Sequence, residues 1–369
     1  MDLNGVSLDA SGPVAELARQ LVDIPSVSGD EAAIADAVEA ALRGAAHLEL
    51  TRDGNALVAR TSLGRPQRVV IAGHLDTVPI KDNVPATWDG DVLVGRGSVD
   101  MKAGVAVMLS LALELSSPVH DLTWVFYDQE EVEASRNGLG RIARNHPEWI
   151  EGDFAILCEP TSGAIEGGCN GTLRADVSIG GVAAHSARSW KGVNAIHGAA
   201  PLLAALSAFE AETITVDGLD YREGVNAVGI RGGIAGNVVP DSCVVTINYR
   251  FAPAWTISEA QDRLKHLVAG AGLGSWSLEF TDLSAAARPG LDAPLAQAFV
   301  AAVTTASGMQ PRAKLGWTDV SRFGELGIPA VNFGPGDPEL AHSDGESCPV
   351  AQIESCRAAL AAWLTQGDR

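Results

Sequence analysis

Acidic residues and histidines stand directly after three apolar runs of this sequence. The junctions are 69–73 followed by His74-Leu75-Asp76, 122–127 followed by Asp128-Gln129-Glu130-Glu131, and 154–158 followed by Glu159. Each apolar run is typical of a buried strand in a parallel sheet. Because ligands of open α/β sheets collect at the carboxyl ends of the strands, we expect these side chains to converge at one edge. Such a concentration of carboxylates predicts a site for divalent cations.

His74 and Asp76 have the spacing of a metal ligand and its orienting partner. One imidazole nitrogen of His74 can bind a metal, while the other needs an acceptor, for which Asp76 is a candidate. Glu130 and Glu131 are adjacent carboxylates that repel each other unless positive charge is near. We therefore predict that one glutamate binds metal and the other carries a proton taken from water. The alternatives are a turn histidine beside a turn aspartate and a solvated acidic loop.

Two further residues complete the candidate metal site. Asp100 stands among glycines at the start of an apolar helix expected over 101–115, and His342 lies in a loop after a short strand at 331–333. Asp100 could cap that helix or bridge two cations through its two oxygens. Two histidines and several carboxylates suit zinc. Two metals that share a carboxylate and a water form a recurring hydrolytic site.

Alternating strands and helices must position these residues. Apolar spacing predicts helices over 13–23 and 31–43, the second with Asp30 as its N-cap. The other expected elements are short strands near 48–52 and 56–61 and a Gly- and Asp-rich loop over 88–98. This alternation predicts an α/β fold with a mainly parallel sheet and helices on both faces.

The pattern changes after residue 171. The expected elements are a strand at 172–179, a helix at 193–209, strands at 226–234 and 243–251, a helix at 257–269 and a strand at 275–282. That order matches the ferredoxin-like split βαβ unit. From about 288 the chain returns to α/β character. We therefore predict a catalytic domain over 1–171 and 288–369, interrupted by a smaller α+β domain over 172–287.

Composition excludes several classes of protein. The 369 residues are 46% hydrophobic, which is typical of a globular protein, and 46 acidic against 26 basic residues give a net charge of −20. That charge argues against nucleic acid as a partner. No apolar run reaches the ~20 residues of a membrane span, and the N-terminus lacks signal-peptide character, which predicts the cytoplasm. The five cysteines form no paired motif and are expected to be small buried residues.

With these motifs in this order, the chain resembles the di-zinc amidohydrolases, the family of aminoacylases, acetylornithine deacetylases and succinyl-diaminopimelate desuccinylases. The resemblance covers nearly the whole chain and implies a zinc-peptidase-like catalytic domain with two Zn²⁺, for which Co²⁺ could substitute. It implies that His74 and Glu159 bind one zinc, that Glu131 and His342 bind the other, and that Asp100 bridges them. Asp76 would orient His74, and Glu130 would be the general base and then the general acid.

The resemblance extends to the inserted domain. His185, in the stretch 183–188, matches a histidine that reaches the partner subunit's active site and stabilises the oxyanion, which implies a homodimer paired through a lid domain. Arg250, Asn237 and Thr318 match positions that hold substrate. Trp317 departs from the glycine-rich stretch of familiar desuccinylases and would narrow that wall of the site.

The likeness is nearest to the desuccinylases, which implies hydrolysis of N-succinyl-L,L-2,6-diaminopimelate to succinate and L,L-diaminopimelate in lysine and cell-wall precursor synthesis. The alternatives are a sibling hydrolase, such as an acetylornithine deacetylase or another N-acyl-amino-acid amidohydrolase, and a non-catalytic, metal-stabilised binding protein. The presence of both Glu130 and Glu131 argues against the last alternative. A succinyl group carries an extra carboxylate, so its pocket should contain a cation or amide donor.

Overall fold

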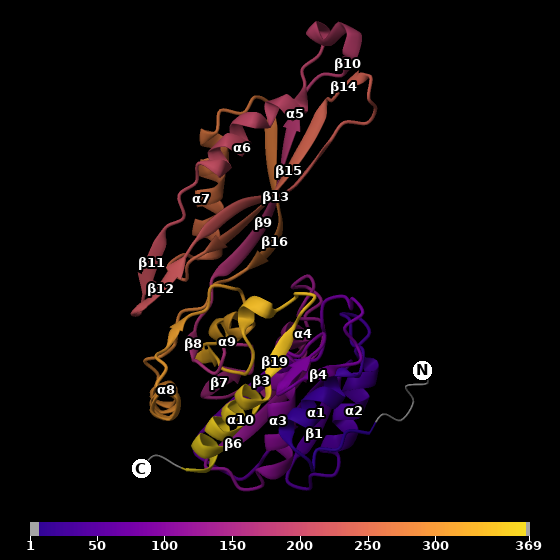
Figure 1. Cartoon of the computed structure of the whole chain (residues 1–369). Coiled ribbons are helices and arrows are strands. Elements are labelled where there is room, and N and C mark those ends of the chain that lie inside the picture. Colours follow the sequence, from indigo (N-terminus) through magenta and orange to yellow (C-terminus); the bar gives the residue numbers. More distant parts are fainter. Residues whose placement is uncertain (1–6, 367–369) are drawn as a thin grey trace. The chain divides into compact units, whose positions relative to one another are not determined.

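The computed structural model describes residues 7–366, which form two compact units (Figure 1). Unit 1 contains the chain up to Gly168, Pro289–Ala313 and the chain from Arg322 onward, and unit 2 contains Cys169–Arg288 and Lys314–Ser321. The segment Lys314–Ser321 corrects the sequence-based division, which assigned it to the catalytic domain. It joins unit 2 because the Asn170 amide donates to the Leu315 carbonyl at 3.2 Å and the Trp317 indole donates to the Ala285 carbonyl at 3.0 Å.

Unit 1 is built on a mixed sheet with a parallel centre. Its strands, in spatial order within the described residues, are β1 (Glu49–Asp53), β2 (Ala56–Arg60), β6 (Asp121–Tyr127), β3 (Arg68–His74), β7 (Phe154–Leu157), β18 (Ala330–Asn332), β8 (Glu166–Gly167) and β17 (Arg312–Ala313). β3 pairs in parallel with both β6 and β7, and β18 continues in parallel with β7. Every residue of β6 is buried, as expected for the continuous apolar run of a central strand. The mainly parallel sheet predicted from the sequence is confirmed.

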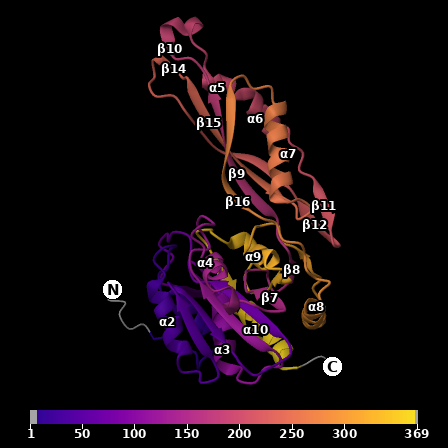
Figure 2. The same ribbon diagram turned by 180° about the vertical axis from the view of Figure 1, so that it is seen from behind.

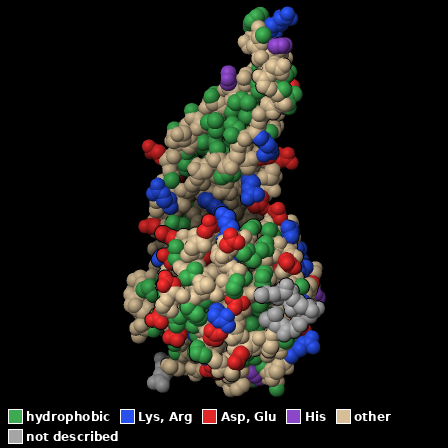
Figure 3. Space-filling model, turned by 45° about the vertical axis from the view of Figure 1, so that its right-hand side comes forward, with side chains coloured by type: hydrophobic (Ala, Val, Ile, Leu, Met, Phe, Trp, Pro, Cys, Tyr) green, Lys and Arg blue, Asp and Glu red, His purple; other side chains and the backbone are tan. Residues whose placement is uncertain are grey.

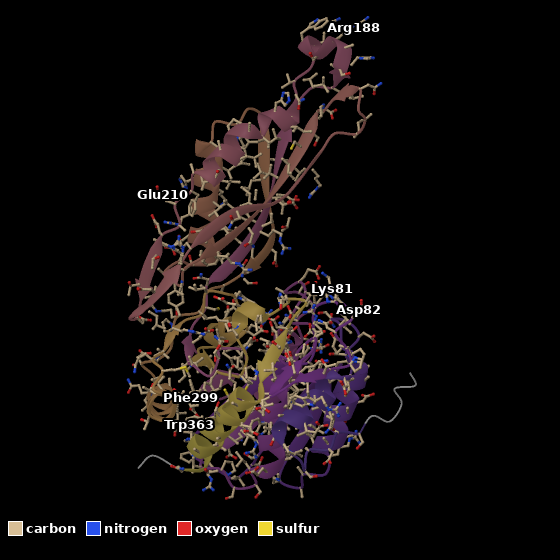
Figure 4. The ribbon with its side chains drawn as sticks, in the orientation of Figure 1. Lys81, Asp82, Arg188, Glu210, Phe299 and Trp363 are labelled. Carbon is tan, nitrogen blue, oxygen red and sulfur yellow. The ribbon has the colours of Figure 1, made fainter. Side chains whose placement is uncertain are left out.

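The helices of unit 1 enclose this sheet. They are α1 (Val14–Val22), α2 (Ala32–Leu42), α3 (Lys102–Glu114), α4 (Gly138–Asn145), α8 (Pro294–Ser307) and α10 (Val350–Thr365), with 3₁₀ turns η1 (Pro147–Trp149) and η3 (Pro338–Leu340). The short helix α9 (Val320–Glu325) begins in the last two residues of the unit 2 segment and continues into unit 1. The apolar helix α3 is buried over most of its length, against α1, α10 and β3. The rings of Phe299 in α8 and Trp363 in α10 lie 4.9 Å apart in the same core (Figure 4).

Two local predictions in unit 1 were wrong. The segment 88–98, expected to be a loop, contributes to a hairpin of β4 (Thr87–Asp89) and β5 (Val92–Val94), which also pairs with β19 (Ser347–Pro349). The Gly- and Asp-rich composition of this segment does not indicate strands, and its pairing partner β19 lies far away in the sequence. Asp30 does not cap α2: the N-cap is Glu31, which makes no side-chain cap hydrogen bond.

Unit 2 has the predicted ferredoxin-like order. Its main sheet, within the described residues, consists of β13 (Gly224–Gly232), β15 (Ser242–Phe251), β9 (Gly171–Gly180) and β16 (Trp276–Ser284) in that spatial order, all antiparallel. The helices are α5 (Ala195–Gly198), α6 (Ala200–Ser207) and α7 (Ile257–Gly270) (Figure 2). The single helix predicted over 193–209 is two helices, divided at Ala199, which is the C-cap of α5 and the N-cap of α6.

Small elements extend unit 2 beyond its main sheet. They are β10 (Ala184–His185), the 3₁₀ segment η2 (Ser186–Lys191), β14 (Val238–Val239) and the hairpin β11 (Thr213–Val216) and β12 (Leu219–Arg222). Figure 4 labels Arg188, which lies at an end of unit 2 with β10 and β14. The core of this unit is separate and lies between α5–α7 and one face of the sheet.

Two general expectations concern the whole chain. All five cysteines lie in the described residues, and all are buried and free of disulfides, as predicted. Within residues 7–366, no helix has the length and apolar character that crossing a membrane requires.

Candidate metal centre

The centre of the parallel sheet brings the predicted strand-end residues together. His74 is the last residue of β3, the stretch 128–131 follows β6, and Glu159 follows β7. Because β3 lies between β6 and β7 and runs parallel to both, the three carboxyl ends share one edge of the sheet. The side chains that sequence analysis placed at one rim therefore occupy neighbouring positions.

Four of the predicted metal ligands form one cluster. His74 Nε2 lies 3.0 Å from Asp100 Oδ1, and His342 Nε2 lies 3.3 Å from Asp100 Oδ2 and 3.0 Å from Glu131 Oε1. Among the described residues, His74, Asp100 and Glu131 offer ligand atoms that all lie within 4.8 Å of one another. The two oxygens of Asp100 face different histidines. Asp100 is not the cap of α3, since the N-cap is Met101.

Asp76 organises the loop that carries the paired glutamates. Its carboxylate is fully buried and accepts hydrogen bonds from the backbone N–H groups of Glu130 (3.0 Å) and Glu131 (3.1 Å) and from the Ser28 hydroxyl (2.7 Å). His74 Nδ1 lies 3.0 Å from the Asp76 carbonyl oxygen and 3.5 Å from its carboxylate. Asp76 therefore contacts both the histidine and the segment that holds Glu130 and Glu131.

Electrostatics show that this cluster suits a cation. Burial raises the pKa of Glu131, and the charge of Asp100 raises it further, against the His342 hydrogen bond. Hydrogen bonds to Asp100 and Glu131 raise the pKa of His342 to about 10. Burial opposes the protonation of His74, yet Asp100, Asp76 and the charge of Glu159 raise its pKa well above the ordinary value. The carboxylates thus retain protons on both imidazoles, and a divalent cation could replace this positive charge.

Glu159 and Glu130 occupy different surroundings. Glu159 is 4% exposed and lies near enough to His74 for its charge to affect the imidazole. Glu130 is half-buried beside Glu131. Both side chains end in a carboxylate, which fits the role of metal ligand predicted for Glu159 and the role of proton carrier predicted for Glu130.

The other predicted site residues belong to unit 2. His185 is exposed at the end of β10, where its Nδ1 accepts the Ala187 N–H at 3.1 Å. Asn237 is exposed, and its backbone carbonyl accepts the Ser186 N–H at 2.9 Å. Thr318 is 3% exposed, and its carbonyl accepts the Cys169 thiol at 3.6 Å. All of these contacts lie within unit 2.

Arg250 lies in β15 and faces away from the helices of unit 2. Its neighbours Tyr249 and Phe251 point into the core, so alternation directs Arg250 to the opposite face. Arg174 of the adjacent β9 is exposed on that face. Burial lowers the pKa of Arg250, and the charge of Arg174 contributes. Two neighbouring guanidinium groups can attract an anion.

Three polar residues around the centre were not predicted from the sequence. Ser28 supports Asp76, Glu346 supports the loop before Asp100, and the buried Lys102 donates to the Ile24 carbonyl at 2.7 Å. Burial lowers the pKa of Lys102 to about 7. A lysine at the start of an otherwise apolar helix was a usable signal, whereas Ser28 and Glu346 stand in loops without any pattern.

Comparison with known proteins agrees with this geometry. The chain is 53% identical to a putative succinyl-diaminopimelate desuccinylase DapE of Mycobacterium tuberculosis, over 94% of this chain and 96% of that protein. It is 45% identical to a succinyl-diaminopimelate desuccinylase of Corynebacterium glutamicum, over 97% and 98% of the two chains. In structure it resembles a tripeptidase of Staphylococcus aureus, with a TM-score of 0.78 at 20% identity over 97% of this chain and 98% of the other. Residues 70–366 match peptidase family M20/M25/M40, and the chain therefore belongs to that family of metal-dependent hydrolases.

Proposed function

We propose that this protein removes the succinyl group from N-succinyl-L,L-2,6-diaminopimelate and releases succinate and L,L-diaminopimelate. The observation that carries this proposal is the cluster of His74, Asp100, Glu131 and His342, in a chain that is 53% and 45% identical to two desuccinylases over nearly its full length. Such a biosynthetic role fits the cytoplasmic location predicted from the sequence.

Two Zn²⁺ are the proposed metals. The donor set combines imidazole nitrogens with carboxylate oxygens, which suits zinc and also accommodates Co²⁺. His74 and Glu159 would hold one ion, and Glu131 and His342 the other. The placement of Asp100 supports a bridging role, because Oδ1 faces His74 and Oδ2 faces His342. When bound, the ions would polarise the amide carbonyl and make the attacking water more acidic.

Glu130 is the proposed proton carrier. Asp76 holds its backbone N–H, which fixes the start of the side chain beside Glu131. The Glu130 carboxylate would take a proton from the attacking water and then donate it to the departing amine nitrogen. Glu130→Gln should keep bound zinc and lose nearly all turnover. Glu133→Gln is the matched control, because Glu133 is exposed and lies 3.7 Å from Arg136. Near-normal turnover of zinc-loaded Glu130→Gln would contradict this role.

The substrate supplies carboxylates that need cationic partners. Arg250 is the proposed donor, with Arg174 beside it on the open face of the sheet. Asn237 and Thr318 are proposed substrate contacts on the family resemblance alone. A side-by-side measurement of kcat/KM for succinyl and acetyl substrates tests whether the pocket selects the succinyl group. A clear preference for the acetyl substrate would favour an acetylornithine deacetylase or another amidohydrolase of the same family.

Unit 2 is also the proposed dimerisation and lid domain. Figure 3 shows hydrophobic side chains gathered on its surface. Val228 and Ile230 of β13 are 58% and 54% exposed, and Ile234 beyond that strand is 87% exposed. β13 is an edge strand of its sheet, and α6 packs beside it with Leu203 36% exposed. An apolar surface next to an unpaired strand edge suits pairing with a second copy.

A subunit-mixing experiment tests the proposed role of His185 in the partner's site. Glu130→Ala and His185→Ala each should lose activity, with kcat of the second lower by roughly 10²–10³. The two variants are mixed in equal amounts and allowed to exchange subunits. If His185 acts across subunits, about half of the dimers are then heterodimers, each with one intact site of two, so about a quarter of the wild-type activity per subunit should return. A mixture with no gain in activity, although mass analysis shows heterodimers, would refute the exchange of histidines.

A further inference from the structure

Glu346 gathers several hydrogen bonds next to the metal centre. Its carboxylate oxygen Oε1 accepts the backbone N–H groups of Gly97 (3.0 Å), Val99 (3.0 Å) and Asp100 (2.9 Å). The other oxygen, Oε2, accepts from Arg96 Nη1 at 2.9 Å. Glu346 is 1% exposed and Arg96 is 2% exposed. A buried carboxylate therefore holds the backbone of the candidate bridging residue.

The shape of the loop explains why a carboxylate stands there. Residues 96–100 curl tightly, with Gly97 at φ +85° and its Cα so close to Thr77 and Lys102 that an added Cβ would meet them at 2.9 and 3.0 Å. The curl directs several N–H groups inward, away from water. Buried N–H groups need acceptors, and an anion satisfies several of them at once. Arg96 balances the charge of Glu346, so the pair as a whole is neutral.

The same pair holds the segment that carries His342. Arg96 Nη1 donates to the Ser343 carbonyl at 3.1 Å, and Gly95 N–H donates to the Glu346 carbonyl at 3.0 Å. Immediately beyond, β19 pairs with β5 through Ser347 and Val94. Two loops that are far apart in the sequence are therefore tied together at Glu346.

These ties set the distance between two candidate ligands. Asp100 takes its backbone position from Glu346, and His342 precedes the Arg96–Ser343 contact by one residue. Asp100 Oδ2 and His342 Nε2 lie 3.3 Å apart. A change in either loop would alter this spacing. A shift of the Asp100 backbone would also move Oδ1, which lies 3.0 Å from His74 Nε2.

We propose that Glu346 is a positioning residue of the metal centre, which fixes the Asp100 backbone against the His342 loop and so sets the spacing of the candidate ligands. This inference rests on the proposed function, because it assumes that Asp100 and His342 are ligands. Partners of metal ligands commonly affect metal affinity by about 10- to 100-fold. A residue with only a structural role would lower stability and leave the metal affinity of the folded protein unchanged.

The test is Glu346→Gln, with metal affinity as the main measurement. An amide has one acceptor oxygen, so it cannot serve both the three N–H groups and Arg96. Zn²⁺ binding to the metal-free protein, measured by competition with a chromophoric chelator, should weaken about 10- to 100-fold for at least one of the two ions. With Co²⁺ as the probe, the visible absorption of that site should also change, since it reports ligand geometry.

Asp121→Asn is the matched control. Asp121 is another buried carboxylate of unit 1, and it accepts the N–H groups of Leu63 and Arg65 and the Thr61 hydroxyl, each at 2.8 Å. It opens β6, at the opposite end of the strand from the metal centre. The control should lower the melting temperature and keep wild-type zinc affinity.

Glu346→Asp covers the case in which Glu346→Gln does not fold. Aspartate keeps the charge that pairs with Arg96, but it is one methylene too short for all four contacts, so an intermediate loss of zinc affinity is expected. The proposal is overturned if a folded Glu346 variant binds both ions within about twofold of wild type, or if Asp121→Asn weakens zinc equally. Wild-type protein that binds no divalent cation would refute the proposed function itself. Failure of the Glu346 proposal can therefore be distinguished from failure of the proposed function.

Discussion

Replacing Asp76 with asparagine should destabilise unit 1 and disturb the metal centre together. Oδ1 of the buried Asp76 accepts the Glu130 N–H, and Oδ2 accepts the Glu131 N–H and the Ser28 hydroxyl. Asparagine has one acceptor oxygen, so in either orientation its NH₂ group faces a backbone N–H. Loss of a hydrogen bond to a charged group, together with an unsatisfied buried N–H, costs about 2–4 kcal/mol.

Urea unfolding of the metal-free protein measures this cost. Ser28→Ala is the comparison, because it removes a single hydroxyl donor and should cost about 1–2 kcal/mol. Asp76→Asn should also weaken zinc binding and lower kcat, since Glu130 and Glu131 lose a shared anchor. If the unfolding free energy of Asp76→Asn lies within about 0.5 kcal/mol of wild type, the carboxylate does not hold this loop and the reasoning fails.

Three other outcomes follow from the geometry. Zinc uptake at pH 7 should release roughly two protons, because carboxylates hold the pKa of His342 at about 10 and the pKa of His74 well above its ordinary value. The apparent zinc affinity should therefore fall as the pH falls. Calorimetry in two buffers measures the number of protons released. Arg250→Met should lower kcat/KM for the succinyl substrate about 10- to 100-fold, because the variant loses a hydrogen bond between a guanidinium group and a substrate carboxylate. Gly104→Ala should cost about 3 kcal/mol in thermal unfolding, because its Cβ would lie 2.1 Å from the Cys158 carbonyl oxygen.

Each of these outcomes has a control and a contrary result. Release of fewer than one proton would mean that the histidines are neutral before metal arrives. Arg231→Met removes an exposed arginine of the same unit that pairs with Asp176 at 2.7 Å, and an equal loss of activity in both variants would rule out a specific role for Arg250. Gly270→Ala adds a methyl group where no atom lies within 4 Å and should leave stability nearly unchanged. An equally stable Gly104→Ala would show that α3 can move away from β7.

Apolar periodicity carried most of the fold prediction. The runs that became β3, β6 and β7 are buried nearly throughout, so their sequence signal does not depend on any partner. The hairpin β4–β5 could not be recognised because its stability comes from pairing with β19, more than 250 positions away. The break at Ala199 has a local signal that the prediction overlooked, because Pro201 lies in the first turn of α6 and favours a helix start. The assignment of Lys314–Ser321 to unit 2 depends on contacts with Asn170 and Ala285 rather than on local composition.

The sequence by itself determined the types of chemistry-bearing residue and the strand ends that carry them, because residue type and strand burial are local properties. His74, Glu130, Glu131 and Glu159 could be placed at one edge for that reason. Only the tertiary structure decided that the two oxygens of Asp100 face different histidines and that Glu346 ties the Asp100 loop to the His342 loop. The contacts of Asp100 with His342 and Glu346 join segments about 240 residues apart, and hydrogen-bond geometry over such separations arises only when the chain has folded.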